Sequence, residues 1–316
     1  MVKTASNKNG IVELFRFLCS IWVAYYHGFF PILSDKFDGV NISVDFFFMV
    51  SGLFFLKSIE KYKEKPFIEG VRYITIGKTK GFIVPLIIAA LSILGCNIIF
   101  ELDFGGFNWP LSFLWFFAAQ FTFLTVYYLI LKNVKKLWVF NLICFGIILL
   151  SMSLCIFMSL SFARQFDRVF RVPAMLGLGM LLSQVPKVKL NLNDKVKAEK
   201  ISLLLNIFGF IVSAGAFLYF AYLPGYTVGK AHLFTCIICP VFLYFATAIP
   251  VKGKFFDFLG ECSIFIYLAQ CPILFHYYAG TQVSTDYFSW LCFYAVALFI
   301  LNRVINAIKQ KRKITA

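Results

Sequence analysis

Ten long apolar blocks, separated by short polar stretches, limit the fold of this chain more than any other feature of its sequence. An α-helix needs about 20 residues to cross a hydrocarbon layer of about 30 Å, and most blocks approach that length. No block alternates polar and apolar residues as a strand of a membrane barrel does. The pattern predicts an all-α, polytopic integral membrane protein of about ten transmembrane helices. One membrane domain is expected to span residues 1–316, with helices near 11–33, 41–57, 82–100, 113–131, 137–158, 172–185, 201–222, 232–249, 258–279 and 287–305.

The distribution of charge gives the expected orientation. The chain is 60% hydrophobic and 14% charged, which excludes a soluble globular domain, a disordered chain and a nucleic-acid reader. With the N-terminus inside, 23 Lys and Arg residues fall on the cytoplasmic side and 5 outside. Cytoplasmic loops of membrane proteins carry this excess, so both termini are predicted to be cytoplasmic. The net charge of +15 therefore reflects topology and contact with the lipid bilayer, and it indicates no nucleic-acid partner.

Four polar residues share one stripe of the first predicted helix: Glu13, Arg16, Ser20 and His27. Arg16 and His27 are eleven positions apart, which at 100° per residue leaves them about 20° off the same face with a rise of roughly 16.5 Å. A charged stripe in a membrane helix faces protein or water, and it commonly marks a functional path. The alternative is a buried polar seam that holds helices together.

Asp45 lies one turn inside the second predicted helix, at a depth similar to that of His27. A carboxylate beside an imidazole can fix its tautomer and stabilise its protonated form. Asp45 could instead only favour the N-terminus of its helix, where negative charge is stabilised. Both interpretations remain open from the sequence.

Several segments follow one another in a recognisable order. Arg16 and His27 form an Arg-x10-His pattern, followed by VDFFFMVSG at 44–52 and by basic residues before Pro85. Later come FRVPAMLGLGMLLS at 170–183 and FLGECSIFIYLAQCPI at 258–273. Together these segments resemble the membrane acyltransferase-3 family, integral membrane O-acyltransferases that act on cell-surface sugars. The resemblance spans most of the chain.

The resemblance implies an activity. Members of the family take an acyl group, usually acetyl, from coenzyme A on the cytoplasmic side and transfer it to a hydroxyl of an extracytoplasmic or lipid-linked carbohydrate. The histidine of the first helix is regarded as essential, and the preceding arginine supports donor binding or local structure. The family's cytoplasmic Arg-x-x-Arg motif is replaced here by Lys78 and Lys80, and its late Tyr-Leu-x-His reads Tyr-Leu-Ala-Gln, ending at Gln270.

Individual residues can be assigned roles in such a reaction. A sugar hydroxyl needs a positioned base, and His27 is the only histidine on the polar stripe. His232 and His276 lie at helix ends, where an interfacial role is expected. Ser20, Ser51 or Arg16 could donate hydrogen bonds to the oxyanion. The phosphates of coenzyme A need cations at the cytoplasmic mouth, for which the candidates are Arg72, Lys78 and Lys80.

Three arginines break the inside-positive distribution. Arg164, Arg168 and Arg171 are predicted to lie outside, before Pro173. We hypothesise that they bind an anionic acceptor, such as an acidic glycan or a lipid-pyrophosphate-linked sugar. Alternatively, they form salt bridges through Asp167 and contact lipid phosphate.

The sequence thus predicts a multi-pass enzyme of the inner plasma membrane with acyl-CoA as co-substrate and with no permanently bound cofactor and no metal. No soluble domain is expected in the chain, so it transfers directly or hands the acyl group to a separate extracytoplasmic protein. Two other classes are considered. A transporter would use Glu13, Arg16, Asp45 and His27 as a relay. A membrane scaffold without catalytic activity gives no reason for charged residues to share a face.

Overall fold

The computed structural model describes residues 9–33, 40–99, 115–160, 167–188, 190, 194–222, 228–280 and 286–315. All regular secondary structure in these ranges is helical, which confirms the all-α class. The α-helices are α1 (Gly10–Leu33), α2 (Val40–Leu53), α3 (Phe55–Ile59), α4 (Phe67–Arg72), α5 (Ile83–Ile99), α6 (Trp115–Asn133), α7 (Leu137–Leu160), α8 (Asp167–Leu182), α9 (Lys195–Tyr222), α10 (Val228–Ala248), α11 (Lys254–Gly280) and α12 (Asp286–Thr315).

Each of the ten predicted blocks overlaps a helix of this set. By length and composition, four helical stretches among the described residues can cross a membrane: Trp115–Asn133, Leu137–Phe157, Lys195–Phe220 and Phe288–Lys309. A fifth span results if Ile42–Leu53 and Phe55–Tyr62, which are bent by 43°, count as one. Several other helices are apolar but shorter. The structure therefore supports a multi-pass membrane protein with four or five clear candidate spans.

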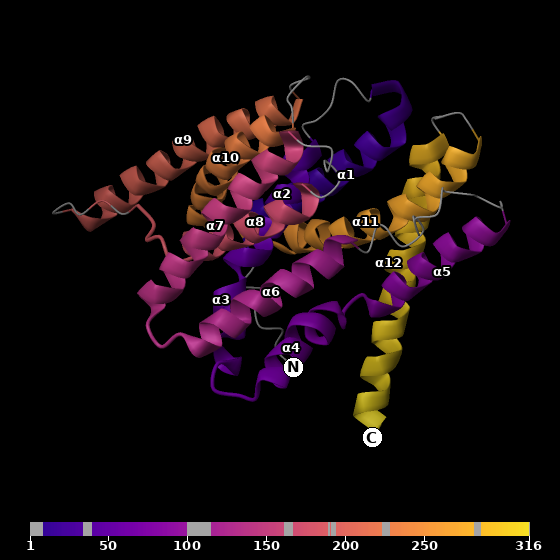
Figure 1. Cartoon of the computed structure of the whole chain (residues 1–316). Coiled ribbons are helices and arrows are strands. Elements are labelled where there is room, and N and C mark those ends of the chain that lie inside the picture. Colours follow the sequence, from indigo (N-terminus) through magenta and orange to yellow (C-terminus); the bar gives the residue numbers. More distant parts are fainter. Residues whose placement is uncertain are drawn as a thin grey trace.

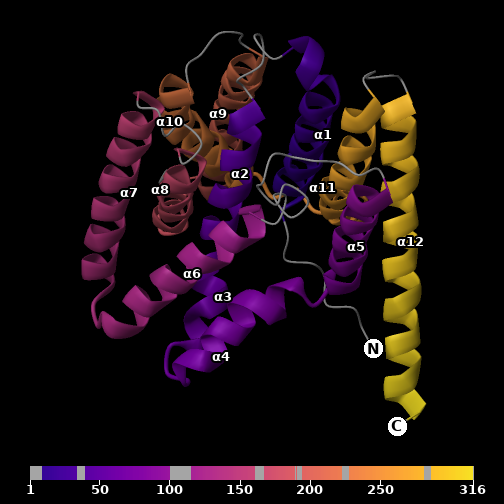
Figure 2. The same cartoon turned by 45° about the vertical axis from the view of Figure 1, so that its right-hand side comes forward.

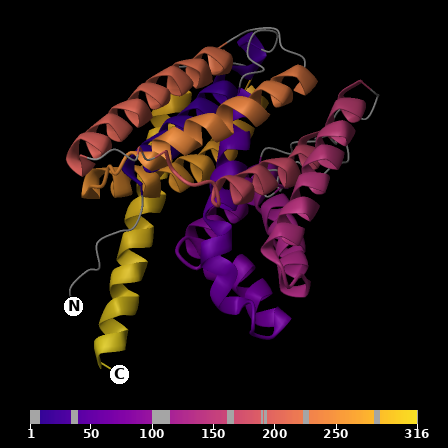
Figure 3. The same cartoon turned by 90° about the vertical axis from the view of Figure 1, so that its left-hand side faces the viewer.

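The helices form a bundle with α2 and α8 near its centre (Figures 1 and 2). Helix α1 packs between α2 and α11, while α8 packs between α2 and α7. Helix α12 lies along α11 and α5 at one edge, and its C-terminal part extends beyond its neighbours (Figure 3). The larger hydrophobic cluster joins α1, α2, α6, α7, α8 and α10, and a smaller one joins α5, α11 and α12.

The contact between α2 and α8 is close because glycine lines it on both sides. A Cβ atom on Gly52 would lie 2.1 Å from the Leu176 carbonyl oxygen, and one on Gly179 would lie 2.1 Å from that of Met49. Small residues let helix backbones approach in this way. Asp45 and Arg171 pair near the beginnings of the two helices, and Leu53 and Leu182 line one cavity at their ends, so α2 and α8 run parallel. The topology predicted from the charges requires the same relation between them.

The segment between α3 and α5 folds onto the end of α6. Its short helical turns bring the rings of Tyr62 and Tyr73 into a stack with centroids 4.7 Å apart. The Tyr128 hydroxyl donates to the Tyr62 carbonyl oxygen at 2.8 Å, and Lys132 Nζ donates to two further carbonyls, at 3.0 and 2.6 Å. The sequence analysis noted only basic residues before Pro85 in this stretch, whereas the structure shows short helices that pack against α6.

Helix α1 begins at a cap that also connects it to the α10–α11 turn. The Asn9 side-chain oxygen accepts the backbone N–H groups of Ile11 and Val12 at 3.0 and 3.2 Å, as an N-cap residue does. Asn9 Nδ2 donates to the Ile249 carbonyl oxygen at 2.9 Å, and the Gly10 N–H donates to that of Val251 at 2.8 Å. The start of α1, one turn before its first charged residue, is thereby fixed against α11.

Candidate active site

The first two charged residues of the predicted stripe form an ion pair on α1. Arg16 Nη1 lies 2.9 Å from Glu13 Oε2, as their three-residue spacing on one helix allows. The two ends of the pair differ in exposure. The Glu13 side chain is 6% exposed, whereas the Arg16 side chain is 30% exposed. Arg16 is thus held by a buried carboxylate and keeps part of its side chain accessible, which suits binding of an anionic group.

Gly260 of α11 makes room for this pair. A Cβ atom at Gly260 would lie 1.6 Å from Glu13 Oε2, so any other residue there would displace the Glu13 carboxylate from its position. Gly260 belongs to the FLGEC segment that the sequence analysis singled out without giving it a role. The structure gives it one, because it lets the Glu13 carboxylate settle against the α11 backbone.

The remaining stripe residues are placed by the helix itself. The side chain of Ser20 is buried, and its hydroxyl donates to the Phe17 carbonyl oxygen at 2.8 Å. The backbone of His27 continues α1, while its side chain lies outside the described residues. Ser51 is half-buried on α2, one position before Gly52. The described contacts therefore join Glu13 to Arg16 and do not join either serine to that pair.

Asp45 is held by Arg171 from α8. Arg171 Nε lies 3.2 Å from Asp45 Oδ1, and the side chains are 1% and 0% exposed. A buried charge is tolerated only when it is paired and hydrogen-bonded, so each residue accounts for the other. The parallel contact of α2 and α8 through Gly52 and Gly179 brings both residues to the same level of the bundle.

This pairing corrects the position expected for Arg171. The sequence analysis grouped it with Arg164 and Arg168 in an exterior cluster available to an acceptor, but its side chain is fully enclosed. The reason is that α8 begins at Asp167, which places Arg171 a full turn inside the helix and against α2. Arg164 and the side chains of Asp167 and Arg168 lie outside the described residues.

Two carbonyl groups of helix α8, near its internal proline, accept hydrogen bonds from side chains of neighbouring helices. Pro173 has no N–H to donate within the helix. The Tyr127 hydroxyl donates to the Pro173 carbonyl oxygen at 2.7 Å, and the Ser151 hydroxyl donates to that of Phe170. Helices α6 and α7 thus support the turn of α8 that carries Arg171.

The three donor-binding candidates are not equivalent. Arg72 and Lys80 are exposed on the segment before α5. Lys78 is half-buried, with Nζ 5.5 Å from the centroid of the Phe55 ring. Burial lowers the pKa of Lys78 to about 8, because removal from water disfavours the charged form. Arg72 and Lys80 are therefore the more accessible cations of the three.

Gln270 stands where the late family motif carries a histidine. Its side chain is 2% exposed, and its Oε1 atom has no hydrogen-bond partner among the described residues. An amide cannot act as the acid or base that a histidine can be. Within the same residues, no group of three or more His, Cys, Asp or Glu side chains could hold a metal ion.

The comparisons with known proteins identify the family of this chain. The sequence pattern that defines the acyltransferase-3 family, described as an acyltransferase domain, matches residues 9–305. The match includes α1 with its ion pair, the α2–α8 contact and Gly260 of α11. No curated protein and no solved structure matches the chain. Since the family pattern covers nearly its whole length, the chain belongs to the acyltransferase-3 family of membrane acyltransferases.

Proposed function

We propose that the protein is an O-acyltransferase of the plasma membrane that moves an acyl group, in the first instance acetyl, from cytoplasmic acyl-CoA to a hydroxyl of an extracytoplasmic or lipid-linked carbohydrate. The observation that carries this proposal is the Glu13–Arg16 pair on α1, in a chain that belongs to a family of membrane acyltransferases. A half-open arginine near the capped start of α1 suits the phosphates of the donor.

The length of α1 relates this cation to the proposed base. His27 follows Arg16 by eleven residues on the same helix, a rise of roughly 16.5 Å. An extended pantetheine arm can cover that separation. A donor held at Arg16, with Arg72 and Lys80 proposed as further cations for its phosphates, could therefore present its thioester near His27.

In the proposed reaction, His27 removes the proton from the acceptor hydroxyl as the oxygen attacks the thioester carbon. The carbonyl becomes an oxyanion, which Ser20, Ser51 or Arg16 would stabilise by hydrogen bonding. Collapse breaks the carbon–sulfur bond, and the coenzyme A thiolate leaves and takes up the proton from His27. Asp45, held by Arg171, is the candidate to orient His27 and to stabilise its protonated form.

For the acceptor, Arg164 and Arg168 remain the proposed contacts to an anionic sugar or to a lipid pyrophosphate. Arg171 is reassigned to positioning, because its guanidinium is enclosed against Asp45. A separate extracytoplasmic protein that receives the acyl group is the alternative recipient.

The experiment that tests this proposal follows acyl transfer directly. Membranes containing wild type, His27→Ala or His276→Ala are incubated with radiolabelled acetyl-CoA, and label is counted in glycan, lipid and protein fractions. His276 is the matched control, since it is a histidine at the far end of α11 with no proposed role in the reaction. We expect label in an acceptor fraction for wild type and the control, and a loss of at least about 100-fold for His27→Ala.

Other results would change the assignment. Equal labelling by His27→Ala would exclude His27 as the base. If wild-type membranes transfer neither acetyl nor succinyl label above empty membranes, the acyl-CoA proposal fails. The charged path of Glu13, Arg16, Asp45 and His27 should then be tested for transport.

A further inference from the structure

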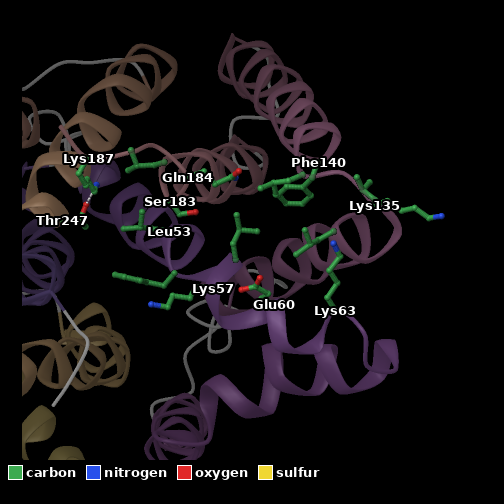
Figure 4. A pocket seen from close by; sticks show the side chains of 16 residues that line it. Leu53, Lys57, Glu60, Lys63, Lys135, Phe140, Ser183, Gln184, Lys187 and Thr247 are labelled. Carbon is green, nitrogen blue, oxygen red and sulfur yellow. Dashed lines mark hydrogen bonds between the residues drawn. The ribbon is translucent and has the colours of Figure 1, made fainter. Parts of the chain in front are cut away.

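A cavity of about 580 Å³ lies where several helices end on the predicted cytoplasmic side (Figure 4). It is formed by the ends of α2, α6, α8 and α10 and by the beginnings of α3 and α7. Its lining comprises Leu53, Phe54, Leu56, Lys57, Glu60, Lys63, Leu131, Val134, Lys135, Leu137, Phe140, Leu182, Ser183, Gln184, Lys187 and Thr247. None of the residues proposed for acyl transfer is in that set.

The lining divides into an apolar part and a basic part. Leu53, Leu131, Phe140 and Leu182 are buried hydrophobic residues of the larger core cluster. Four lysines contribute positive charge against the single carboxylate of Glu60. In Figure 4, Lys57 and Lys63 approach from the segment that begins with α3, whereas Lys187 approaches from the opposite side with Ser183 and Gln184. A molecule in the cavity would therefore contact lysines from both sides and the buried hydrophobic residues of the lining.

The four lysines lack the carboxylate partners that would neutralise them. In the part of the chain that the structure describes, no salt bridge involves Lys57, Lys63, Lys135 or Lys187. Lys187 is nevertheless held in place. Its Nζ donates to Thr247 Oγ1 at 2.6 Å and to the Tyr244 carbonyl oxygen at 3.0 Å, and it lies 4.3 Å from the centroid of the Tyr244 ring. Neutral groups thus orient this cation and leave its charge uncompensated.

We propose that this cavity binds a phosphate-bearing amphiphile, with its phosphate at the basic part of the lining and an apolar chain against Leu53, Leu131 and Phe140. The lysine ammonium group is a compact positive charge that binds phosphate well, and the hydrophobic residues of the lining can pack against an acyl chain. Two sources share this chemistry at the inner face of a membrane: an anionic phospholipid and a long-chain coenzyme A thioester. Neither requires that the protein transfer acyl groups, so the site stands apart from the proposed activity.

The test measures binding to the full-length protein rather than turnover. Wild type and the cavity variant Lys57→Gln/Lys63→Gln/Lys187→Gln are purified in neutral detergent. A matched control, Lys61→Gln/Lys65→Gln/Lys136→Gln, removes the same charge from exposed lysines that do not line the cavity. One arm measures retention of phosphatidylglycerol by native mass spectrometry, and the other measures binding of radiolabelled palmitoyl-CoA by equilibrium dialysis.

We expect the control to match wild type and the cavity variant to bind at least one of the two ligands about tenfold or more weakly. Loss of phosphatidylglycerol binding alone identifies a phospholipid site, and loss of palmitoyl-CoA binding alone identifies a site for a long-chain coenzyme A thioester. Because Lys187 is half-buried and hydrogen-bonded, its substitution could disturb the fold. The double variant Lys57→Gln/Lys135→Gln changes only exposed lysines and keeps the contacts of Lys187, and it should weaken binding of the same ligand. The proposal fails if wild type binds neither ligand, or if the cavity variants and the control bind both equally.

Discussion

Two carboxylate–guanidinium pairs in this molecule have the same chemistry and opposite surroundings. Glu13 and Arg16 come from successive turns of α1, and the arginine keeps 30% of its side chain exposed. Asp45 and Arg171 come from different helices, and both side chains are enclosed. The first pair leaves a cation available to a ligand, whereas the second uses its cation entirely within the protein.

This difference in exposure distinguishes an arginine that can bind a ligand from an arginine that positions another residue. A guanidinium that is enclosed in an ion pair with a buried carboxylate can bind a ligand only if that pair breaks. Breaking a buried ion pair costs several kcal/mol of stability, about 3–5 kcal/mol in typical cases. Arg171 therefore serves to hold Asp45, and Arg16 is the arginine of the two that can meet a substrate. The predictions below test this division, beginning with the pair that the structure makes most sensitive.

Arg171→Ala should have the largest effect. It leaves Asp45 buried without its cation, and breaking a buried pair typically costs about 3–5 kcal/mol. The double variant Asp45→Leu/Arg171→Met removes both charges and should recover most of that stability. The measurement is the free energy of unfolding in detergent, with Arg72→Ala as the exposed control. A loss of less than about 1 kcal/mol of unfolding free energy in the single variant would mean that the pair is exposed to solvent.

The sequence was sufficient to predict the local pair but not the distant one. Helical periodicity alone brings Glu13 and Arg16 together, because residues three apart on a helix are neighbours. Arg171 meets Asp45 only after α2 and α8 pack, and nothing in the spacing of two segments so far apart encodes that contact. The prediction of an exposed Arg171 followed from assigning α8 a later start than the structure gives it. A signal was present in the glycines of VSG and LGLGM, which mark close helix contacts.

Gly52→Ala should have the next largest effect, because it acts on the contact that aligns the sealed pair. Its Cβ atom would meet the Leu176 carbonyl oxygen at 2.1 Å, and a backbone atom of a packed helix cannot move aside. Overpacking of this kind costs about 1–3 kcal/mol. Gly215→Ala is the matched control, since its Cβ would meet nothing within 4 Å, and alanine there should be neutral or stabilising. Equal unfolding temperatures for the two variants would contradict the inferred α2–α8 contact.

The same reasoning explains why the fold of the segment between α3 and α5 was not predicted. Its lysines were predicted from charge bias alone, which says nothing about their burial. The structure buries part of Lys78 against Phe55 and leaves Arg72 and Lys80 exposed, because the chain folds back onto α6 through Tyr62 and Tyr128. Such tertiary contacts override what composition indicates.

Arg16→Gln should affect stability less than Arg171→Ala and activity more selectively. The half-open pair contributes about 1–2 kcal/mol, since one partner is solvated. If Arg16 binds the donor, the KM for acyl-CoA should rise about tenfold or more, while the KM for the acceptor stays the same. Arg16→Lys should recover part of the loss. A change confined to the acceptor KM would assign Arg16 to the other substrate.

The smallest effect concerns charges that have no carboxylate at all. Burial lowers the pKa values of Lys78 and Lys187 from 10.5 to about 8. Between these values the unfolded chain binds more protons than the folded protein, so stability should rise as pH increases from about 8 toward 10.5. Below about pH 8 both states are protonated and the full cost of burying the charge is present. Unfolding temperatures at pH 7.5 and 9.5 should show this rise in wild type and a smaller one in Lys78→Gln/Lys187→Gln. An identical rise in both proteins would show that these lysines are not desolvated. A lysine can lose its proton when it is buried, whereas an arginine cannot, which is why the buried Arg171 needs Asp45.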